Sequence, residues 1–497
     1  MTDNSKTPRV AYSQDPSPLR YVHPAHWQNP TPHGRYDWLI VGAGPAGITA
    51  AERAVALGAK VALVERNLLG GNSLNVGSVP SKSLVYTSSL CSDLRKAADY
   101  FRPVDRGASA DFAAVTARAQ RVHARIAEYH SAHRLERLGV DIHFGKARFI
   151  DEQSIDVDGV TLTFDKALIA TGARPRRPDI RGLEEVGYRT STDIFDLPSV
   201  PKHLAVIGGG PLGCELAQAF CRLGSNVAII QNDPKFLPRE ERDAAEILSR
   251  SMARDGVEIR LNTTVVGARM NGGKKTLDLL SNAQTCTVET DEILLSVGRI
   301  ANVDDLALDR CGVRCNGDIG IVVDEFLRTT NPRIFAAGDV CMSHKFTHVA
   351  KFTATMATEN ALTDAQRNHR ELIVPWCTFC DPEIAHVGMQ VWDAKSHNIP
   401  VTTYTVMMHD VDRAIIDEQD IGFVKVHVQD GTDRILGATI VASRASEMVN
   451  EITLAMNAGI GMRDLAKVLH IYPSQAEAMH MTSLAFMQKD ATPSSIR

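Results

Sequence analysis

Two glycine-rich turns, each between an apolar strand pattern and an apolar-periodic helix pattern, constrain the fold more than any other feature. The first lies in YDWLIVGAGPAGITAAERAVALGAKVALVER, residues 36–66, which predicts a strand, a turn, a helix and a second strand ending at Glu65. Gly42 permits the tight turn, Gly44 lets a pyrophosphate approach the backbone, and Gly47 packs the helix against the strand. The helix N-terminus would face the phosphates, and Glu65 is placed to accept hydrogen bonds from a ribose diol. The segment is therefore predicted to be a dinucleotide-binding βαβ unit.

A second unit repeats this plan in HLAVIGGGPLGCELAQAFCRLGSNVAIIQN, residues 203–232. Its turn glycines are Gly208, Gly210 and Gly213. Gln231 holds the position equivalent to Glu65, and this neutral side chain neither repels a 2′-phosphate nor pairs with one, so the choice between NADH and NADPH stays open. The alternative is a vestigial site that binds no nicotinamide, because a fold can outlive its ligand.

The composition is that of a soluble globular protein with several domains. A chain of 497 residues is too long for one hydrophobic core. The net charge is -5 and no basic run stands out, so no nucleic-acid partner is expected. No apolar run reaches the ~18 residues of a membrane-spanning helix, and the first residues lack the apolar core of a signal peptide, so we expect a cytoplasmic protein with no membrane partner.

The nine cysteines are scattered along the chain and predict reduced thiols, not a disulfide framework. Cys377 and Cys380 form a CxxC, but the surrounding PWCTFCDPEIAHVG predicts extended chain, in which residues three apart point to opposite faces. We interpret both as packing cysteines. No metal site is expected.

Three further segments carry a family resemblance: GGNSLNVGSVPSK (residues 70–82), ATGARPRRP (residues 170–178) and NPRIFAAGDV (residues 331–340). With the two glycine turns, they make the chain from about Tyr36 to Lys489 resemble the two-dinucleotide flavoprotein disulfide reductases, which include dihydrolipoamide dehydrogenase and mercuric reductase. The resemblance implies an α/β fold with two Rossmann-like, doubly wound domains and a C-terminal α+β dimerisation domain. It also implies a homodimer with FAD and either NADH or NADPH as cofactors.

Five segments are expected on this basis. They are a proline-rich arm over residues 1–36, the first part of the FAD-binding domain over 37–184, the NAD(P)-binding domain over 185–301, the second part of the FAD-binding domain over 302–367, and the dimerisation domain over 368–497. In the last segment, strands are expected to alternate with helices over about 446–459 and 462–470.

Both redox cysteines of the family's GGxCxNxGCxPSK segment are replaced in this chain, by Ser73 and Ser78. A serine hydroxyl cannot form a disulfide and is not usefully ionised near neutral pH, so dithiol chemistry is not available to these two side chains. Hydroxyls at these positions could instead orient a polar substrate. We therefore expect electrons to leave the flavin directly.

The resemblance also assigns cofactor contacts. With the first glycine turn, the FAD set is Gly42, Gly44, Gly47, Glu65, Gly71, Ala147, Thr171, Gly172, Gly338, Asp339, Phe346, Thr347 and His348. With the second turn, the NAD(P) set is Gly208, Gly210, Gly213, Gln231 and Gly298. In the family, the aspartate of this set bonds the ribityl chain, and a lysine paired to a glutamate lies near flavin N5, which suggests Lys82 and Glu215. The alternative is that Lys82 and Glu215 form an ordinary ion pair between helices.

The family's closing signature, HxHPTxxE, completes the partner subunit's active site and is HIYPSQAE here, residues 470–477. Tyr472 replaces the general-base histidine and Glu477 keeps the carboxylate, a pattern similar to that of mercuric reductases. Tyrosine, with a pKa of about 10, is a poor base at neutral pH but a competent hydrogen-bond donor. Mercury reduction is nevertheless disfavoured, because it needs thiolates at the flavin and a cysteine pair near the C-terminus, and the last residues contain none.

We therefore expect a diaphorase- or oxidase-type NAD(P)H oxidoreductase that passes electrons from reduced flavin to a small acceptor, such as a quinone, dioxygen, a metal ion or an organic oxidant. One alternative is a Cys-to-Ser variant of a mercuric reductase-like disulfide reductase. The other is a flavin-binding scaffold that turns nothing over.

Overall fold

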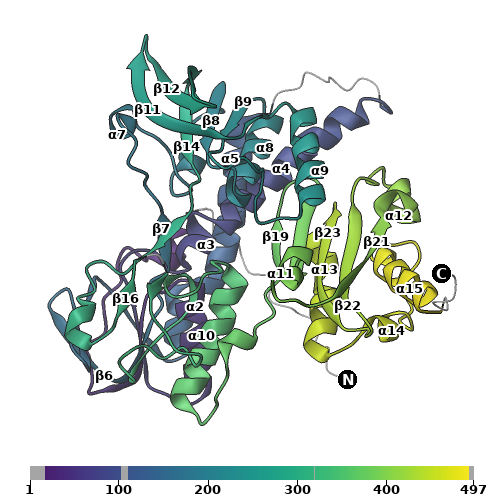
Figure 1. Ribbon diagram of the computed structural model, residues 1–497. Helices are drawn as coiled ribbons and strands as arrows, with labels where there is room; N and C mark the ends of the chain where they lie inside the picture. Colours follow the sequence, from purple (N-terminus) through teal and green to yellow (C-terminus); the bar gives the residue numbers. More distant parts are fainter. Residues whose placement is uncertain (1–16, 102–109, 318, 492–497) are drawn as a thin grey trace, which may run out of the picture.

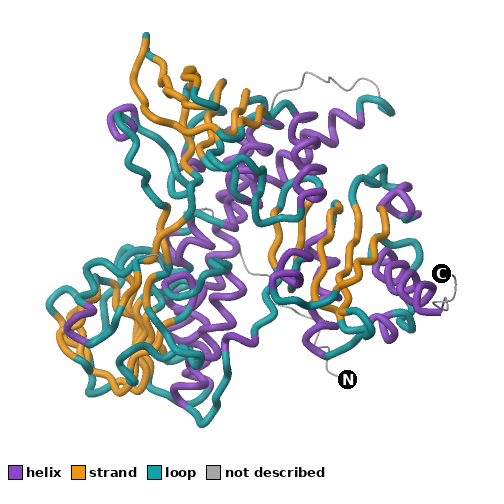
Figure 2. Tube along the Cα trace, in the orientation of Figure 1, coloured by secondary structure: helices purple, strands orange, loops and turns teal. Residues whose placement is uncertain are grey.

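The computed structural model describes residues 17–101, 110–317 and 319–491, and shows three bodies with a long helix between two of them (Figure 1). Expectations for the first 16 residues of the arm and for the last six residues of the chain lie outside the described residues. Helices lie against the faces of the strand layers in each body (Figure 2). The predicted α/β class with two dinucleotide-binding units is confirmed.

The first body is a seven-stranded sheet in the order β3-β2-β1-β6-β5-β4, with β18 paired to β6. Its strands are β1 Tyr36–Val41, β2 Val61–Glu65, β3 Val140–Phe144, β4 Ala147–Asp151, β5 Ser154–Val157, β6 Val160–Ile169 and β18 Ile334–Ala336. Helix α2 Pro45–Ala56 packs on α10 Thr347–Leu362, so the chain returns to this body after the second unit. The central strands read as continuous apolar runs because both faces of the sheet are covered.

The second body repeats the plan with a parallel sheet in the order β10-β9-β8-β14 and an antiparallel meander β11-β12-β13. The strands are β8 His203–Ile207, β9 Asn226–Ile230, β10 Glu258–Arg260, β11 Thr263–Asn271, β12 Lys274–Ser281, β13 Gln284–Thr290 and β14 Glu292–Leu295. The helices are α7 Leu183–Val186, α8 Pro211–Arg222 and α9 Arg242–Asp255.

Two connections tie these bodies together. Strand β7 Ala173–Pro175 pairs with β15 Arg299–Ala301, which brings the chain out of the second body beside the strand on which it entered. The twenty-residue helix α4 Ser78–Ala97 contacts both α8 and α5 Phe112–Ala127 (Figure 1). Helix α4 begins within the segment 70–82 and therefore links that segment to the second body. The remaining short elements are α3 Gly71–Asn75, α6 Ala132–Arg137, β16 Cys315–Asn316 and β17 Gly320–Ile321.

The third body is a five-stranded antiparallel sheet in the order β19-β20-β23-β22-β21. Its strands are β19 Trp376–Thr378, β20 Glu383–Gly388, β21 Val401–Met407, β22 Phe423–Gln429 and β23 Ile435–Ala442. Its helices are α11 Val391–Ser396, α12 Asp412–Ile416, α13 Ala445–Ala458, α14 Met462–Leu465 and α15 Glu477–Ala491. The α+β pattern is as predicted.

The helix expected over residues 462–470 is wrong in length, because α14 ends at Leu465. Beyond it, Leu469 is 97% exposed and Ile471 is 82% exposed, so their apolar side chains do not pack on this subunit's core. A short helix without a buried face has little to stabilise it, and the turn unwinds there.

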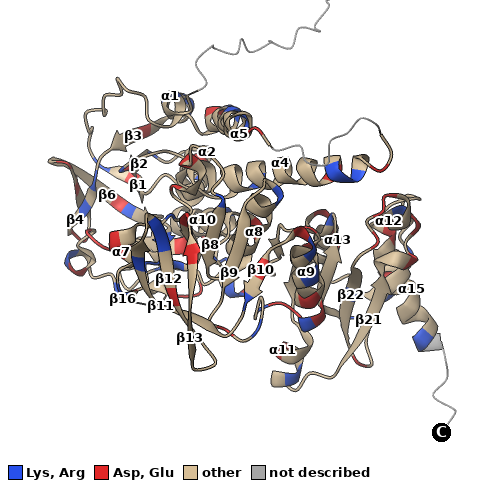
Figure 3. Ribbon diagram, turned by 90° about the horizontal axis from the view of Figure 1, so that it is seen from above, with Lys and Arg blue, Asp and Glu red and all other residues tan. Residues whose placement is uncertain are grey.

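No helix within the described residues is long and apolar enough to cross a membrane. Lysine and arginine side chains are interspersed with aspartate and glutamate over the three bodies (Figure 3).

Candidate functional site

The first glycine turn leaves room for a ligand at one glycine and none at the other two. Gly42 has a φ of 102°, and a Cβ added there would lie 2.6 Å from the carbonyl oxygen of Ala170. A Cβ on Gly47 would collide with the carbonyl oxygen of Gly42, whereas one on Gly44 would reach only the Cα of Gly71, at 3.8 Å. The first and third glycines are thus required by the backbone itself, and the second faces the open approach that a pyrophosphate needs.

Glu65 ends β2 beside this turn and is buried. Its Oε2 accepts the backbone N–H of Ala43 at 2.7 Å, and its Oε1 accepts the N–H of Asn67 at 2.8 Å. Burial raises the pKa of Glu65, opposed by these two donors. Each carboxylate oxygen has a second lone pair, so the side chain can still accept from ribose hydroxyls. The turn and the carboxylate together fit the ADP half of FAD.

The second turn has the same construction. A Cβ on Gly208, whose φ is 104°, would collide with the carbonyl oxygen of Ser296, and one on Gly213 would collide with Gly208, while one on Gly210 would meet nothing within 4 Å. Gln231 accepts the N–H of Gly209 at 2.7 Å through its Oε1, as Glu65 does with Ala43. Its amide NH2 group carries two donors that make no hydrogen bond to the described residues, so it can donate to a ligand. The open second glycine fits a dinucleotide here too.

The serine segment lies beside the first turn. A Cβ added to Gly71 would come within 2.7 Å of the Cα of Gly44, so the backbones of the two segments are in direct contact. Ser73 lies in α3, and its Oγ accepts a hydrogen bond of 2.9 Å from the Thr347 hydroxyl at the start of α10. Ser78 is the first residue of α4. All nine cysteines of the chain lie among the described residues, and each is a free thiol.

Lys82 and Glu215 form the ion pair that the sequence suggested. The Nζ of Lys82, on α4, lies 2.7 Å from Oε2 of Glu215, on α8, and Glu215 is only 3% exposed. The other carboxylate oxygen, Oε1, accepts the N–H of Phe379 at 3.0 Å, and the Phe379 ring lies 4.4 Å from Nζ of Lys82. Sequence reasoning missed Phe379, because its contribution is a backbone N–H and a ring face supplied by the third body.

Three cysteines surround this ion pair. Cys380 interacts electrostatically with Cys214, Cys377, Lys82 and Glu215, and burial raises the pKa of all three thiols. A neutral buried thiol is a poor nucleophile and a poor electron relay. The CxxC therefore has the environment of packing cysteines.

The segment around Asp339 is held by cations. Asp339 pairs with Arg299 at 2.8 Å, and Lys345 donates to the carbonyl oxygen of Asp339 at 2.6 Å. Gly338, whose φ is 75°, packs close to α10, since a Cβ there would lie 3.1 Å from that of Ala350. Arg299 is a second residue that sequence reasoning missed, although it directly follows the predicted Gly298.

Besides Thr347, two further predicted FAD residues, Phe346 and His348, lie at the start of α10, and the remaining predicted FAD and NAD(P) residues lie elsewhere in the chain. The rings of Phe346 and His348 stack with centroids 5.4 Å apart, and burial lowers the pKa of His348, whose Nε2–H donates to the carbonyl oxygen of Pro375 at 2.9 Å. Thr171 donates to the carbonyl oxygen of Asn302 at 2.7 Å. Gly172 follows it with a φ of 69°, Gly298 has a φ of 95°, and Ala147 begins β4.

Tyr472 and Glu477 are not brought to Ser73 within one subunit. They lie in the third body, and Figure 1 places α15 far from α3. Tyr472 is 65% exposed, and its hydroxyl donates to Asp412 at 2.7 Å, which raises the pKa of the phenol.

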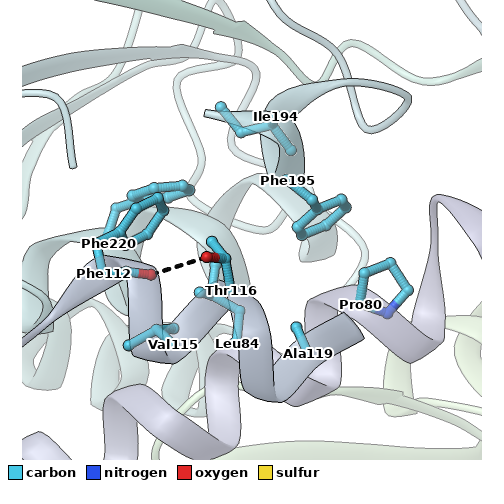
Figure 4. A pocket seen from close by; sticks show the side chains of 9 residues that line it. All are labelled: Pro80, Leu84, Phe112, Val115, Thr116, Ala119, Ile194, Phe195 and Phe220. Carbon is cyan, nitrogen blue, oxygen red and sulfur yellow. Dashed lines mark hydrogen bonds between the residues drawn. The ribbon is translucent and has the colours of Figure 1, made fainter. Parts of the chain in front are cut away.

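A small apolar pocket lies one turn beyond Ser78, between α4, α5 and α8 (Figure 4). It is lined by Pro80, Leu84, Phe112, Val115, Thr116, Ala119, Ile194, Phe195 and Phe220. Its volume is about 20 Å³, room for about one water molecule and no organic substrate. This pocket is therefore too small for a substrate, and the candidate site stays the region around Ser73, Lys82 and α10.

Comparisons with known proteins agree with this geometry. The family described as pyridine nucleotide-disulphide oxidoreductase matches residues 36–360, and its dimerisation domain matches residues 374–483. The chain is 33% identical to a mercuric reductase from Staphylococcus aureus over 91% of this chain and 83% of the relative. It is also 33% identical to a dihydrolipoyl dehydrogenase from Geobacillus stearothermophilus over 90% of this chain and 96% of the relative.

Two solved structures share the fold. The HOCl-induced flavoprotein disulfide reductase RclA from Escherichia coli is 28% identical, with a TM-score of 0.81 over 90% of this chain and 99% of that protein. LpdA from Mycobacterium tuberculosis is 27% identical, with a TM-score of 0.83 over 91% of this chain and 100% of that protein. Members of this family are oxidoreductases that contain FAD and use NAD(P)H. From its two glycine turns to its C-terminal dimerisation domain, this chain belongs to the pyridine nucleotide-disulphide oxidoreductase family.

Proposed function

We propose that the protein is an FAD-dependent NAD(P)H oxidoreductase that passes electrons from the flavin directly to a small acceptor, without a redox disulfide. The observation that carries this proposal is the pair Ser73 and Ser78, which stand where the family's segment has its two cysteines. The three thiols nearest the Lys82–Glu215 pair do not replace them, because burial raises the pKa of each.

The chain's own residues then bind the two cofactors, orient them and shield them. FAD supplies the two-electron chemistry when bound. The first glycine turn and Glu65 hold its ADP half, and the second turn with Gln231 receives the nicotinamide nucleotide. Lys82, held by Glu215, places a positive charge where negative charge on reduced FAD would be stabilised.

The acceptor side is completed by a second subunit. Ser73 and Thr347 form a hydroxyl pair that can orient a polar acceptor. Tyr472 and Glu477 of a second copy would close this opening, which explains why Leu469 and Ile471, close to Tyr472 in sequence, are exposed in one subunit. The Tyr472 phenol, whose ordinary pKa is about 10, is protonated at neutral pH and serves as a hydrogen-bond donor to the acceptor once its bond to Asp412 is released.

The comparisons indicate that metal ions should be among the first acceptors tested. RclA forms a Cu(II) complex, and several relatives are mercuric reductases. A screen of the NAD(P)H-reduced protein against Cu(II), Hg(II), a quinone and dioxygen, with flavin reoxidation as the signal, separates a metal reductase from a diaphorase or an oxidase.

Anaerobic titration tests the missing disulfide directly. We expect bound flavin to bleach fully after one two-electron equivalent of NAD(P)H per FAD, with no long-wavelength thiolate-to-flavin band, because no disulfide stands beside the flavin to take up a second electron pair. Absorption spectra during the titration measure both quantities. Uptake of a second equivalent would contradict the proposal, and failure of both NADH and NADPH to bleach the flavin would favour a non-catalytic scaffold.

The matched variant is Ser73→Cys with Ser78→Cys. We expect it to take up a second two-electron equivalent and to develop the long-wavelength band, since it restores the family's dithiol. The same titration measures this change. A variant that behaves like the unaltered protein would show that the segment does not adopt the family's disulfide geometry.

A further inference from the structure

The segment before the first strand packs against the FAD-binding body, although it lies outside the family match, which begins at residue 36. Within residues 17–35, here called the arm, α1 Leu19–Val22 forms one helical turn and the rest is largely extended. Helix α1 contacts α5 and α6, and α6 packs on β3, which lies at one edge of the first sheet. The structural match with RclA covers 99% of the RclA chain but only 90% of this chain.

The arm covers the free edge of β3. Trp27 donates its Nε1–H to the carbonyl oxygen of Ile142 at 3.2 Å. Asn29 binds both backbone groups of Phe144, donating to its carbonyl oxygen at 2.7 Å and accepting its N–H at 2.8 Å. The ring of His23 stacks on Phe144 with centroids 4.2 Å apart and an angle of 14°. These contacts satisfy backbone groups that an open strand edge leaves unpaired.

The arm also grips the loop after β2. The carbonyl oxygen of Val22 accepts the N–H of Leu69 at 3.0 Å, and Nδ1–H of His23 donates to the carbonyl oxygen of Asn67 at 2.6 Å. Val22 and Leu69 are both fully buried. On its other side, the same loop bonds the first glycine turn, since Gly70 donates to the carbonyl oxygen of Ala43 at 2.8 Å. The loop is therefore held between the arm and the glycine turn.

Both sets of arm contacts are made to segments that bond Glu65. The loop residue Asn67 donates its N–H to Oε1 of Glu65, and Gly145, which follows Phe144, donates its N–H to the carbonyl oxygen of Glu65 at 2.9 Å. His23 therefore contacts Asn67, which bonds Glu65 directly. Asn29 contacts Phe144, whose neighbour Gly145 bonds Glu65.

We propose that the arm is a positioning element for the ADP half of FAD, in which His23 and Asn29 fix the loop and the strand end that orient Glu65. The arm does not touch the cofactor. The arm restricts the motion of the groups that contact the cofactor. Loss of the arm's contacts is therefore expected to weaken FAD binding without altering the surroundings of the isoalloxazine ring. This inference goes beyond electron transfer and depends only on FAD binding.

The test compares two double variants of the full chain loaded with FAD. His23→Ala with Asn29→Ala removes both grips, whereas the matched control, His26→Ala with Gln28→Ala, alters exposed arm residues of the same types. Removing these three hydrogen bonds and the ring stack of His23 on Phe144 is expected to raise the rate of FAD release about tenfold in the first variant and not in the control. Release is followed by the fluorescence of free flavin after dilution, and the visible spectrum of the bound flavin is expected to stay the same.

A role in folding alone has a different signature. It would lower the melting temperature of the apoprotein and leave the FAD dissociation constant unchanged, and this result would overturn the proposal, as would equal release from both double variants. If the double variant does not fold, the single variants His23→Ala and Asn29→Ala are measured, each expected to raise release about threefold. Electron transfer is not part of these readouts, so the outcome is independent of the proposed function.

Discussion

Replacing Lys82 with methionine is expected to lower the free energy of unfolding by about 3 kcal/mol, because it leaves Glu215 buried without its cation. Glu215 is 3% exposed and would keep only one partner, the N–H of Phe379. Lys82 lies on α4, and its ion pair joins this helix to Glu215 on α8. Loss of the lysine therefore also loosens the contact between α4 and the second body. Urea denaturation of the apoprotein measures the change.

Two further variants separate the ion pair from simple loss of a lysine. Lys467→Met breaks an exposed pair with Asp464, in which the side chains are 75% and 61% exposed, and is expected to cost less than about 1 kcal/mol. Lys82→Met combined with Glu215→Leu removes both charges and is expected to regain most of the lost stability. A double variant no more stable than Lys82→Met would show that Glu215 does not depend on this cation.

The same Lys82→Met variant is expected to slow reduction of the bound flavin by at least about tenfold, if the lysine stabilises charge on FAD as proposed. Stopped-flow absorbance with NAD(P)H measures the rate. An unchanged rate with lowered stability would leave Lys82 as an ordinary ion pair between helices.

Deprotonation of Glu240 is expected to make stability fall as the pH rises from about 4.5 to 8. The carboxyl is 4% exposed, its Oε1 accepts the indole N–H of Trp376 at 2.9 Å, and its Oε2 has no hydrogen-bond partner. Burial raises the pKa of Glu240 from 4.5 to about 7, opposed by the hydrogen bond from Trp376 and then by the charge of Arg242. Because the residue joins the second body to Trp376 of the third, its charge acts on the contact between them.

The sign follows from the raised pKa. The folded state holds the proton more tightly than the unfolded state, so the contribution to stability is fully present below the unfolded value of 4.5 and is lost as the pH passes about 7. A shift of this size corresponds to about 3 kcal/mol. Glu240→Gln, neutral at every pH, is expected to lack this loss.

Denaturation at a series of pH values measures the effect as the difference between the unaltered protein and Glu240→Gln. The control is Glu246→Gln, because Glu246 is 60% exposed on α9 and is expected to give a curve parallel to that of the unaltered protein. Parallel curves for Glu240→Gln and the unaltered protein would contradict the buried, protonated carboxyl.

Local patterns in the sequence were sufficient for the two βαβ units. Gly42 and Gly208 adopt positive φ angles and lie against a neighbouring carbonyl oxygen, so no other residue fits, and the strand and helix on either side follow from apolar periodicity. The helix over 462–470 was wrong in length because Met462 and Leu465 are buried, whereas Leu469, in its second half, is 97% exposed and does not face this subunit's core.

What the amino-acid sequence by itself determined is the family frame and the loss of sulfur at Ser73 and Ser78, since both are properties of residue type and spacing. Only the tertiary structure decided which groups surround them. The Phe379 N–H on Glu215, the pairing of Arg299 with Asp339, and the grip of the arm on Asn67 join residues far apart in the chain, and no local spacing encodes such contacts. They arise when three separately patterned bodies pack together, and burial then sets the pKa values and the contacts at the site.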